Sequence, residues 1–178
     1  MKNIAIIGAG AWGTALAMVA RRAGRNVVLQ AHEPEVVDAV NEACENSLFL
    51  PGVALDPEIR ATNDPAEAAV DTDVVLLVVP PQFLRAVLTG LLGHLPSAAP
   101  VVICAKGIEQ STGALMSDVA AQASPQATLA ALSGPTFAHE VADGLPAAVT
   151  LACAGGKAQW ERLSPVIARP HFRPYYSD

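Results

Sequence analysis

Charged and aromatic side chains are scarce in this sequence. Charged residues make up 16% of its 178 residues, and aromatic residues make up 4%. Lysine and arginine together number only 11, against 17 acidic residues, which gives a formal net charge of −6. A nucleic-acid-binding surface requires a strongly basic patch, so this balance argues against nucleic acid as a partner.

Cysteine is also rare, and its spacing indicates no metal or redox site. The three cysteines, of which no two form a CxxC pair, are Cys44, Cys104 and Cys153. We expect reduced thiols, two of them in buried strands. The histidines His94, His139 and His171 also lack the spacing of metal ligands.

Long apolar runs are absent as well. No stretch approaches the roughly 20 apolar residues of a membrane-spanning helix. The apolar stretch from Lys2 to Ala20 has some likeness to a signal peptide, but glycines at a patterned spacing interrupt it. We therefore expect a cytoplasmic protein without an integral membrane segment.

Hydrophobic residues, by contrast, make up 52% of the chain. This content suits one domain built on a parallel sheet with helices on both faces. It also indicates some apolar surface that a further domain or a second copy covers, so a homodimer is one expectation.

Strand and helix patterns alternate along the chain. The expected strands cover residues 4–7, 27–29, 74–79, 101–104, 128–132 and 147–153, with an edge strand near 171–176. The expected helices cover residues 11–23, 34–43, 65–70, 82–92, 113–123 and 157–168, and Pro135 is expected to open another. Residues 45–64 are expected to form a long loop with at most one short strand, near residues 60–62. The alternation predicts an α/β, Rossmann-type, doubly wound and mainly parallel sheet.

The turn after the first strand has the spacing of a dinucleotide-binding loop, GAGAWG at residues 8–13, here called the glycine loop. Gly8 permits a tight turn, Gly10 leaves room for a pyrophosphate, and Gly13 lets the helix lie close to the strand. The helix that follows then directs its free amides at the phosphates. A merely tight strand-to-helix turn is the alternative, but the position between a strand and a helix at the N-terminus favours a nicotinamide dinucleotide.

The end of the second strand bears on cofactor choice. Glu33 has roughly the spacing of the acid that binds the adenosine ribose, and His32 could instead lie beside a 2′-phosphate. No arginine follows directly. Glu33 acting only as a helix cap is an equally weighted alternative.

Two later turns carry candidate substrate contacts. Lys106 follows a buried strand, where ligands bind in open α/β sheets, and its ammonium could hold a phosphate or polarise a carbonyl; a solvated loop lysine is the alternative. Gly134 and Thr136 follow another strand, and Pro135 at the first helical position would leave the amides after it free for an anion. An ordinary helix start explains that pattern equally well.

Six blocks extend these motifs over the whole chain. They are GAGAWGTALA at residues 8–17, FLPG at 49–52, AKGIE at 105–109, LSGPTFA at 132–138, GLPAAV at 144–149 and FRPYYS at 172–177. Together they resemble bacterial NAD(P)-dependent glycerol-3-phosphate dehydrogenase. The resemblance implies reversible hydride transfer between NAD(P)H and dihydroxyacetone phosphate, giving glycerol 3-phosphate for glycerophospholipid synthesis.

The resemblance also implies residue roles. The implied cofactor site comprises Gly8, Gly10, Ala11, Trp12, Gly13, His32, Phe49, Lys106 and Ala138. Substrate contacts would come from Lys106, Gly134 and Thr136. This sequence departs from the family at Ala11, where serine is common, at Phe49, where tyrosine is common, and at His32–Glu33, where an arginine pair is frequent. NADPH is expected to be favoured only modestly over NADH.

In this family a second, all-helical domain follows and carries the lysine thought to act as general acid/base. The sequence ends at Asp178, so residues 1–178 are expected to form the N-terminal NAD(P)-binding domain, without that catalytic lysine. Two alternatives remain: a free-standing dinucleotide sensor, and another two-domain reductase of the 2-hydroxyacid or ketopantoate type. The AKGIE and LSGPTFA blocks argue against the second.

Overall fold

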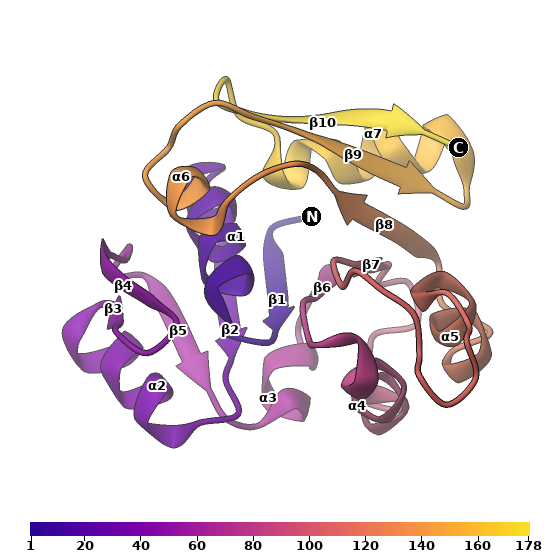
Figure 1. Ribbon diagram of the computed structural model, residues 1–178, viewed down its shortest axis with the longest axis horizontal. Coiled ribbons are helices and arrows are strands. Elements are labelled where there is room, and N and C mark those ends of the chain that lie inside the picture. Colours follow the sequence, from indigo (N-terminus) through magenta and orange to yellow (C-terminus); the bar gives the residue numbers. More distant parts are fainter.

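An eight-stranded sheet forms the centre of the computed structural model, which describes residues 1–178 (Figure 1). Its strand order is β10-β9-β8-β7-β6-β1-β2-β5. The strands are β1 (Asn3–Ile7), β2 (Asn26–Gln30), β5 (Ile59–Thr62), β6 (Val74–Leu77), β7 (Val101–Ile103), β8 (Leu129–Ser133), β9 (Ala147–Cys153) and β10 (Phe172–Ser177). Strands β8 to β5 in this order are parallel, whereas β9 pairs antiparallel with β8 and parallel with β10.

The parallel part has the strand order of a dinucleotide-binding fold, because the chain moves outward from β1 through β2 to β5 and then returns to β6, β7 and β8. The predicted fold class is therefore confirmed. The expected edge strand near residues 171–176 is confirmed as β10, which ends the sheet.

Helices cover both faces of the sheet, and each face has its own core. The helices are α1 (Ala11–Arg22), α2 (Pro34–Asp38), α3 (Pro65–Ala69), α4 (Leu84–Leu91), α5 (Met116–Ala123), α6 (Ala138–Ala142) and α7 (Gly156–Ile167). The core under α1, α2, α6 and α7 holds Ile4 and Ile6 of β1, and the core under α3, α4 and α5 holds Ala5 and Ile7. This alternation along β1 is the two-residue period of a strand buried on both sides. None of the helices is both long and apolar enough to cross a membrane.

The prediction for residues 45–64 was wrong in part. The segment contains a two-stranded hairpin, β3 (Glu45–Asn46) and β4 (Leu50–Ala54), in addition to the expected β5. Leu50 and Val53 are buried in the core that also contains α1. The hairpin is thus held by tertiary packing, which the prolines and glycine of the segment do not reveal.

Several predicted boundaries also moved. The expected helix over 34–43 continues beyond α2 as a π-helical turn (Ala39–Ala43), ended by Cys44 in the left-handed region at φ 53°. Helix α5 begins at Met116, not near residue 113, because Gly113 has φ +70° and Ile108 pairs with Leu115 across that loop. The strand expected over 74–79 ends at Leu77.

Pro135 does not open a helix. Helix α6 starts at Ala138, with Phe137 as its N-cap residue in an extended conformation. The prediction that Pro135 occupies the first helical position, and frees the amides of Thr136 and Phe137 for a ligand, was therefore wrong. Residues 134–137 instead form an irregular connection between β8 and α6, with a bend at Pro135.

Candidate cofactor and substrate site

The glycine loop has the geometry that the sequence predicts. Gly8 has φ +109°, and a Cβ there would lie 2.7 Å from the carbonyl oxygen of Val78. A Cβ at Gly13 would lie 1.9 Å from the carbonyl oxygen of Gly8. At Gly10, by contrast, a Cβ would meet no atom within 4 Å. Gly8 and Gly13 are thus required by the protein's own backbone, whereas the space at Gly10 is free for a ligand.

The first turn of α1 is open to an anion. Its N-cap residue, Gly10, has no side chain to accept hydrogen bonds from the helix amides, and no acidic residue lies in the first turn. The positive end of the helix dipole is therefore uncompensated by the protein, while Arg21 and Arg22 lie in the last turn. A bound phosphate is the usual partner of such a helix start.

The glycine loop lies at the point where the sheet changes winding direction. Strand β1 lies between β2 and β6, and β1 and β6 are followed by helices on opposite faces, α1 and α4. In open α/β sheets, ligands bind at the carboxyl ends of such strands.

Successive turns at this edge touch one another. Gly8, after β1, lies against Val78, which follows β6. Gly107, after β7, lies close to Pro81, since a Cβ on this glycine would be 3.2 Å from Pro81 Cγ. Lys106 Nζ, also after β7, donates a 2.9 Å hydrogen bond to the carbonyl oxygen of Gly134 after β8. The structure therefore places the glycine loop, Lys106 and Gly134 along one continuous edge.

The loop that carries Lys106 is anchored from α4 and its preceding turn. Arg85 makes two 2.8 Å bonds to the carboxylate of Glu109, and the Thr112 hydroxyl donates to the same carboxylate at 2.6 Å. Gln82 donates to the carbonyl oxygen of Ile108 and accepts from the amide of Gln110, both at 3.0 Å. The Arg85 guanidinium, followed by the Thr112 hydroxyl, lowers the pKa of Glu109 to about 2. The sequence did not reveal this network, because α4 and the Lys106 loop are far apart along the chain.

The connection between β8 and α6 holds the other predicted substrate residues. Gly134 is needed because β9 lies against it: a Cβ would be 2.8 Å from Val149 Cγ1. Thr136 and Ala138 are half-buried, the latter against the core under α1. Helix α6 is tied to α1 by Arg22, whose Nη1 donates to the Val141 carbonyl oxygen at 3.0 Å and whose Nη2 donates to that of Ala142.

The remaining predicted cofactor residues lie around the start of α1 and the end of β2. Ala11 and Trp12 begin α1 and are half-buried. The ring centroids of Trp12 and Phe172 lie 6.5 Å apart. His32 is exposed beyond β2. Glu33 is the N-cap residue of α2 but makes no side-chain capping bond, so the alternative that it only caps the helix is not supported.

Phe49 lies in the turn of the β3–β4 hairpin, and its backbone is held by Asn46, which the sequence motifs did not single out. The buried Asn46 side chain accepts from the amide of Phe49 at 3.1 Å and donates to the carbonyl oxygen of Ala9 at 2.8 Å. An asparagine inside a predicted loop is common, so the sequence gives no signal for this role without the hairpin.

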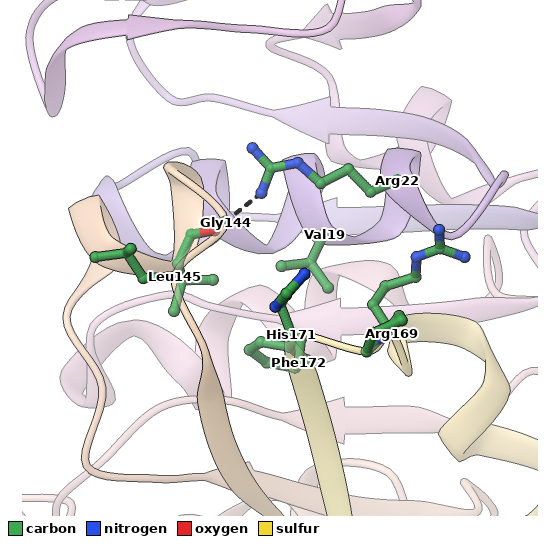
Figure 2. A pocket seen from close by; sticks show the side chains of 9 residues that line it. Val19, Arg22, Gly144, Leu145, Arg169, His171 and Phe172 are labelled. Carbon is green, nitrogen blue, oxygen red and sulfur yellow. Dashed lines mark hydrogen bonds between the residues drawn. The ribbon is translucent and has the colours of Figure 1, made fainter.

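A separate cavity lies away from these residues. It has a volume of about 380 Å³ between the second half of α1, the end of α6 and the turn before β10 (Figure 2). Arg22 extends along α1 toward Gly144, while Arg169 and His171 come from the turn before β10. None of the predicted site residues lines it. No group of three or more histidine, cysteine or carboxylate side chains is placed to hold a metal ion.

Comparisons with known proteins identify the family of the chain. The family model described as NAD-dependent glycerol-3-phosphate dehydrogenase N-terminus matches residues 3–159. The chain is 58% identical, over 99% of its length, to glycerol-3-phosphate dehydrogenase [NAD(P)+] of Novosphingobium aromaticivorans, and 56% identical, over 98%, to that of Caulobacter vibrioides. It spans 52% of each of these relatives, which is about half of their length.

Solved structures show the same relationship. The crystal structure of glycerol-3-phosphate dehydrogenase from Coxiella burnetii superposes with a TM-score of 0.91 and 32% identity, covering 99% of this chain and 54% of that one. A ketopantoate reductase from Ralstonia eutropha gives a TM-score of 0.72 at 22% identity over 100% of this chain and 57% of that one, which shows the shared fold alone. The family model and the curated relatives confirm the resemblance drawn from the sequence blocks, and the chain belongs to the NAD-dependent glycerol-3-phosphate dehydrogenase family, whose N-terminal part it matches.

Proposed function

We propose that this chain is the NAD(P)-binding part of an sn-glycerol-3-phosphate dehydrogenase, which transfers hydride reversibly between NAD(P)H and dihydroxyacetone phosphate. The observation that carries the proposal is the glycine loop. It lies at the winding switch of the sheet, with an uncapped helix start and free space at Gly10. Dinucleotide-binding folds use this combination to hold a pyrophosphate.

The other predicted cofactor residues complete the proposed binding site. The amides at the start of α1, including those of Ala11, Trp12 and Gly13, would hold the pyrophosphate. His32, Phe49, Lys106 and Ala138 would contact the rest of the dinucleotide, as the family resemblance implies. When bound, the nicotinamide supplies or accepts the hydride. NADPH is proposed to bind modestly better than NADH, because His32 is exposed at the end of β2 and could approach a 2′-phosphate.

Lys106, Gly134 and Thr136 form the proposed substrate end of the site. The Lys106 ammonium is exposed and has three donors, of which the bond to Gly134 uses one. The others can bind the phosphate or the ketone oxygen of dihydroxyacetone phosphate. We assign the general acid/base to no residue of this chain and propose that it comes from the part of the family's proteins that this chain does not span.

We further propose that the whole protein acts in the cytoplasm, where glycerol 3-phosphate feeds glycerophospholipid synthesis.

Several large apolar side chains remain exposed near the proposed site: Phe83, Ile108, Leu115 and Phe137. A second domain or a second copy of the chain would cover such surface. Sedimentation of the purified chain tests the homodimer.

Gly10→Val tests the proposed cofactor site. The added side chain would fill the free space at the loop without meeting protein atoms, so the fold should persist while dinucleotide binding is lost. Gly90→Val is the matched control, because a Cβ at Gly90 in α4 would also meet no atom within 4 Å. Calorimetric titration with NADH and NADPH measures both variants. Unchanged affinity in folded Gly10→Val would remove the glycine loop from the cofactor site.

A further inference from the structure

We infer that Asn46 is a positioning residue for the cofactor, which fixes the glycine loop and the Phe49 turn relative to each other. The inference rests on the proposed function, since it takes both segments as parts of the dinucleotide site. Asn46 ends β3, and its side chain is completely buried between the hairpin and the start of α1.

All the hydrogen-bonding groups of the Asn46 side chain are used. Its Nδ2 donates to the Ala9 carbonyl oxygen and to the Thr14 hydroxyl, each at 2.8 Å, and its Oδ1 accepts from the Phe49 amide at 3.1 Å. A carbonyl can only accept and a backbone amide can only donate, so these partners fix the orientation of the side-chain amide. The bonds therefore define one relative position of the two segments.

The Ala9 carbonyl lies inside the glycine loop, between Gly8 and Gly10. It also accepts a 3.3 Å bond from the Thr14 hydroxyl. Asn46 and Thr14 thus both donate to the Ala9 carbonyl oxygen. Thr14 and Asn46 are both fully buried, and Ala9 is nearly so. Water cannot replace a lost bond here without entering the core. Loss of Asn46 therefore leaves the Phe49 amide without its partner and the Ala9 carbonyl with only the longer bond from Thr14.

A loop that is fixed before binding loses less conformational freedom when the ligand arrives. Asn46 should therefore raise dinucleotide affinity without contacting the dinucleotide. The same side chain holds the backbone of Phe49. The contributions of Asn46 and Phe49 to dinucleotide affinity should therefore depend on each other.

Asn46→Ala tests this inference, with Asn41→Ala as the matched control. Asn41 also exchanges two bonds with one backbone position, donating to the Ala61 carbonyl oxygen at 3.0 Å and accepting from the Ala61 amide at 2.8 Å. These bonds lie between the π-helical turn and β5, away from the glycine loop. We expect both variants to unfold at lower denaturant concentration, but only Asn46→Ala to lose dinucleotide affinity, by about tenfold.

A double-mutant cycle with Phe49→Ala separates positioning from general loosening. If Asn46 acts partly by holding Phe49, its removal should cost less affinity in the Phe49→Ala background than in the unaltered chain. Three outcomes would each overturn the inference. Asn46→Ala could lose the same affinity in both backgrounds, Asn46→Ala could lose no affinity, or Asn41→Ala could lose as much affinity as Asn46→Ala. Asn46→Ser replaces Asn46→Ala if the latter does not fold, because a serine hydroxyl is too short to bridge both segments.

Amide NMR without cofactor distinguishes failure of this inference from failure of the proposed function. The amide signals of residues 8–13 should shift in Asn46→Ala and stay in place in Asn41→Ala, and the Phe49 amide should exchange faster with solvent only in the first. If the unaltered chain binds no dinucleotide, the proposed function fails, and with it the role of Asn46 toward the cofactor. If the unaltered chain binds the dinucleotide but the amide signals of residues 8–13 do not shift in Asn46→Ala, the inference is overturned and the proposed function stands.

Discussion

The Lys106 ammonium donates a 2.9 Å hydrogen bond to the backbone carbonyl oxygen of Gly134. The bond joins the turn after β7 to the turn after β8 and brings together two residues that the sequence assigns to the substrate. Because Lys106 is exposed, the bond leaves its charge available to a ligand.

Replacing Lys106 with methionine should weaken substrate binding and leave the fold intact. The affinity for dihydroxyacetone phosphate, measured by calorimetry with oxidised cofactor so that no reaction occurs, should fall about tenfold or more, as expected for a lost charged hydrogen bond. Stability should change by no more than about 0.5 kcal/mol, because the side chain is exposed. Lys2→Met, another exposed lysine, should leave the affinity unchanged; an equal loss there would remove the special role of Lys106.

The 178-residue chain should bind the dinucleotide yet oxidise NADH or NADPH very slowly with dihydroxyacetone phosphate. Loss of a general acid/base alone typically costs about 10²–10⁴ in rate, and loss of substrate orientation adds to that. The assay compares the chain with a full-length member of the family. Similar turnover by both would place the catalytic groups within residues 1–178.

Cofactor choice should depend on His32. His32→Arg should raise the ratio of NADPH to NADH affinity, because a guanidinium binds phosphate in a bidentate manner. His32→Gln should lower the same ratio. His171→Gln, an exposed histidine in the turn before β10, serves as the control. A ratio that is the same in all three variants would show that His32 does not approach the 2′-phosphate.

The Arg85–Glu109 pair should make stability sensitive to acid. The folded pKa of Glu109, about 2, lies below its ordinary value of 4.5. The pair therefore stabilises the fold fully above about pH 4.5 and progressively less as the pH falls toward 2. In Arg85→Met, the urea midpoint should be lower at pH 7, and the difference from the unaltered chain should shrink at pH 3.

Arg60→Met provides the comparison for that measurement. Arg60 pairs with Glu67, but both side chains are exposed, at 62% and 46%. Exposed pairs contribute little, so the urea midpoint should move much less. A larger shift in Arg60→Met than in Arg85→Met would contradict the assigned anchoring role of Glu109.

The native chain should react with iodoacetamide at Cys44 only. Cys104 and Cys153 are buried, and burial raises the pKa of both thiols, which disfavours the reactive thiolate. Mass spectrometry of alkylated peptides measures this, with urea-unfolded chain as the control in which all three react. Rapid native labelling of Cys104 would indicate that its strand end opens to solvent.

Short-range patterns in the sequence were enough to predict most of the helices and strands and the glycine loop. The apolar run of β1, the helical pattern of α1 and the spacing of the three glycines are short-range signals. The contact of Gly8 with Val78, by contrast, is visible only in the fold. Strand β9 was predicted at its observed bounds from a short-range signal of the same kind. The sequence blocks around Lys106 and Gly134 are recognisable as motifs, but they do not indicate the hydrogen bond between these two residues.

The distant residues that hold these elements in place became evident from the fold. The packing of the β3–β4 hairpin on the core that contains α1, the bonds of Asn46 to Ala9 and Thr14, and the Arg85–Glu109 pair each join residues that are far apart along the chain. No local pattern records such partners. Pro135 shows the converse. Its local preference for a helix start does not decide the structure. Gly134 packs closely against β9, and helix α6 begins only at Ala138. Backbone preferences amount to about 1 kcal/mol per residue, and close packing of this kind outweighs them.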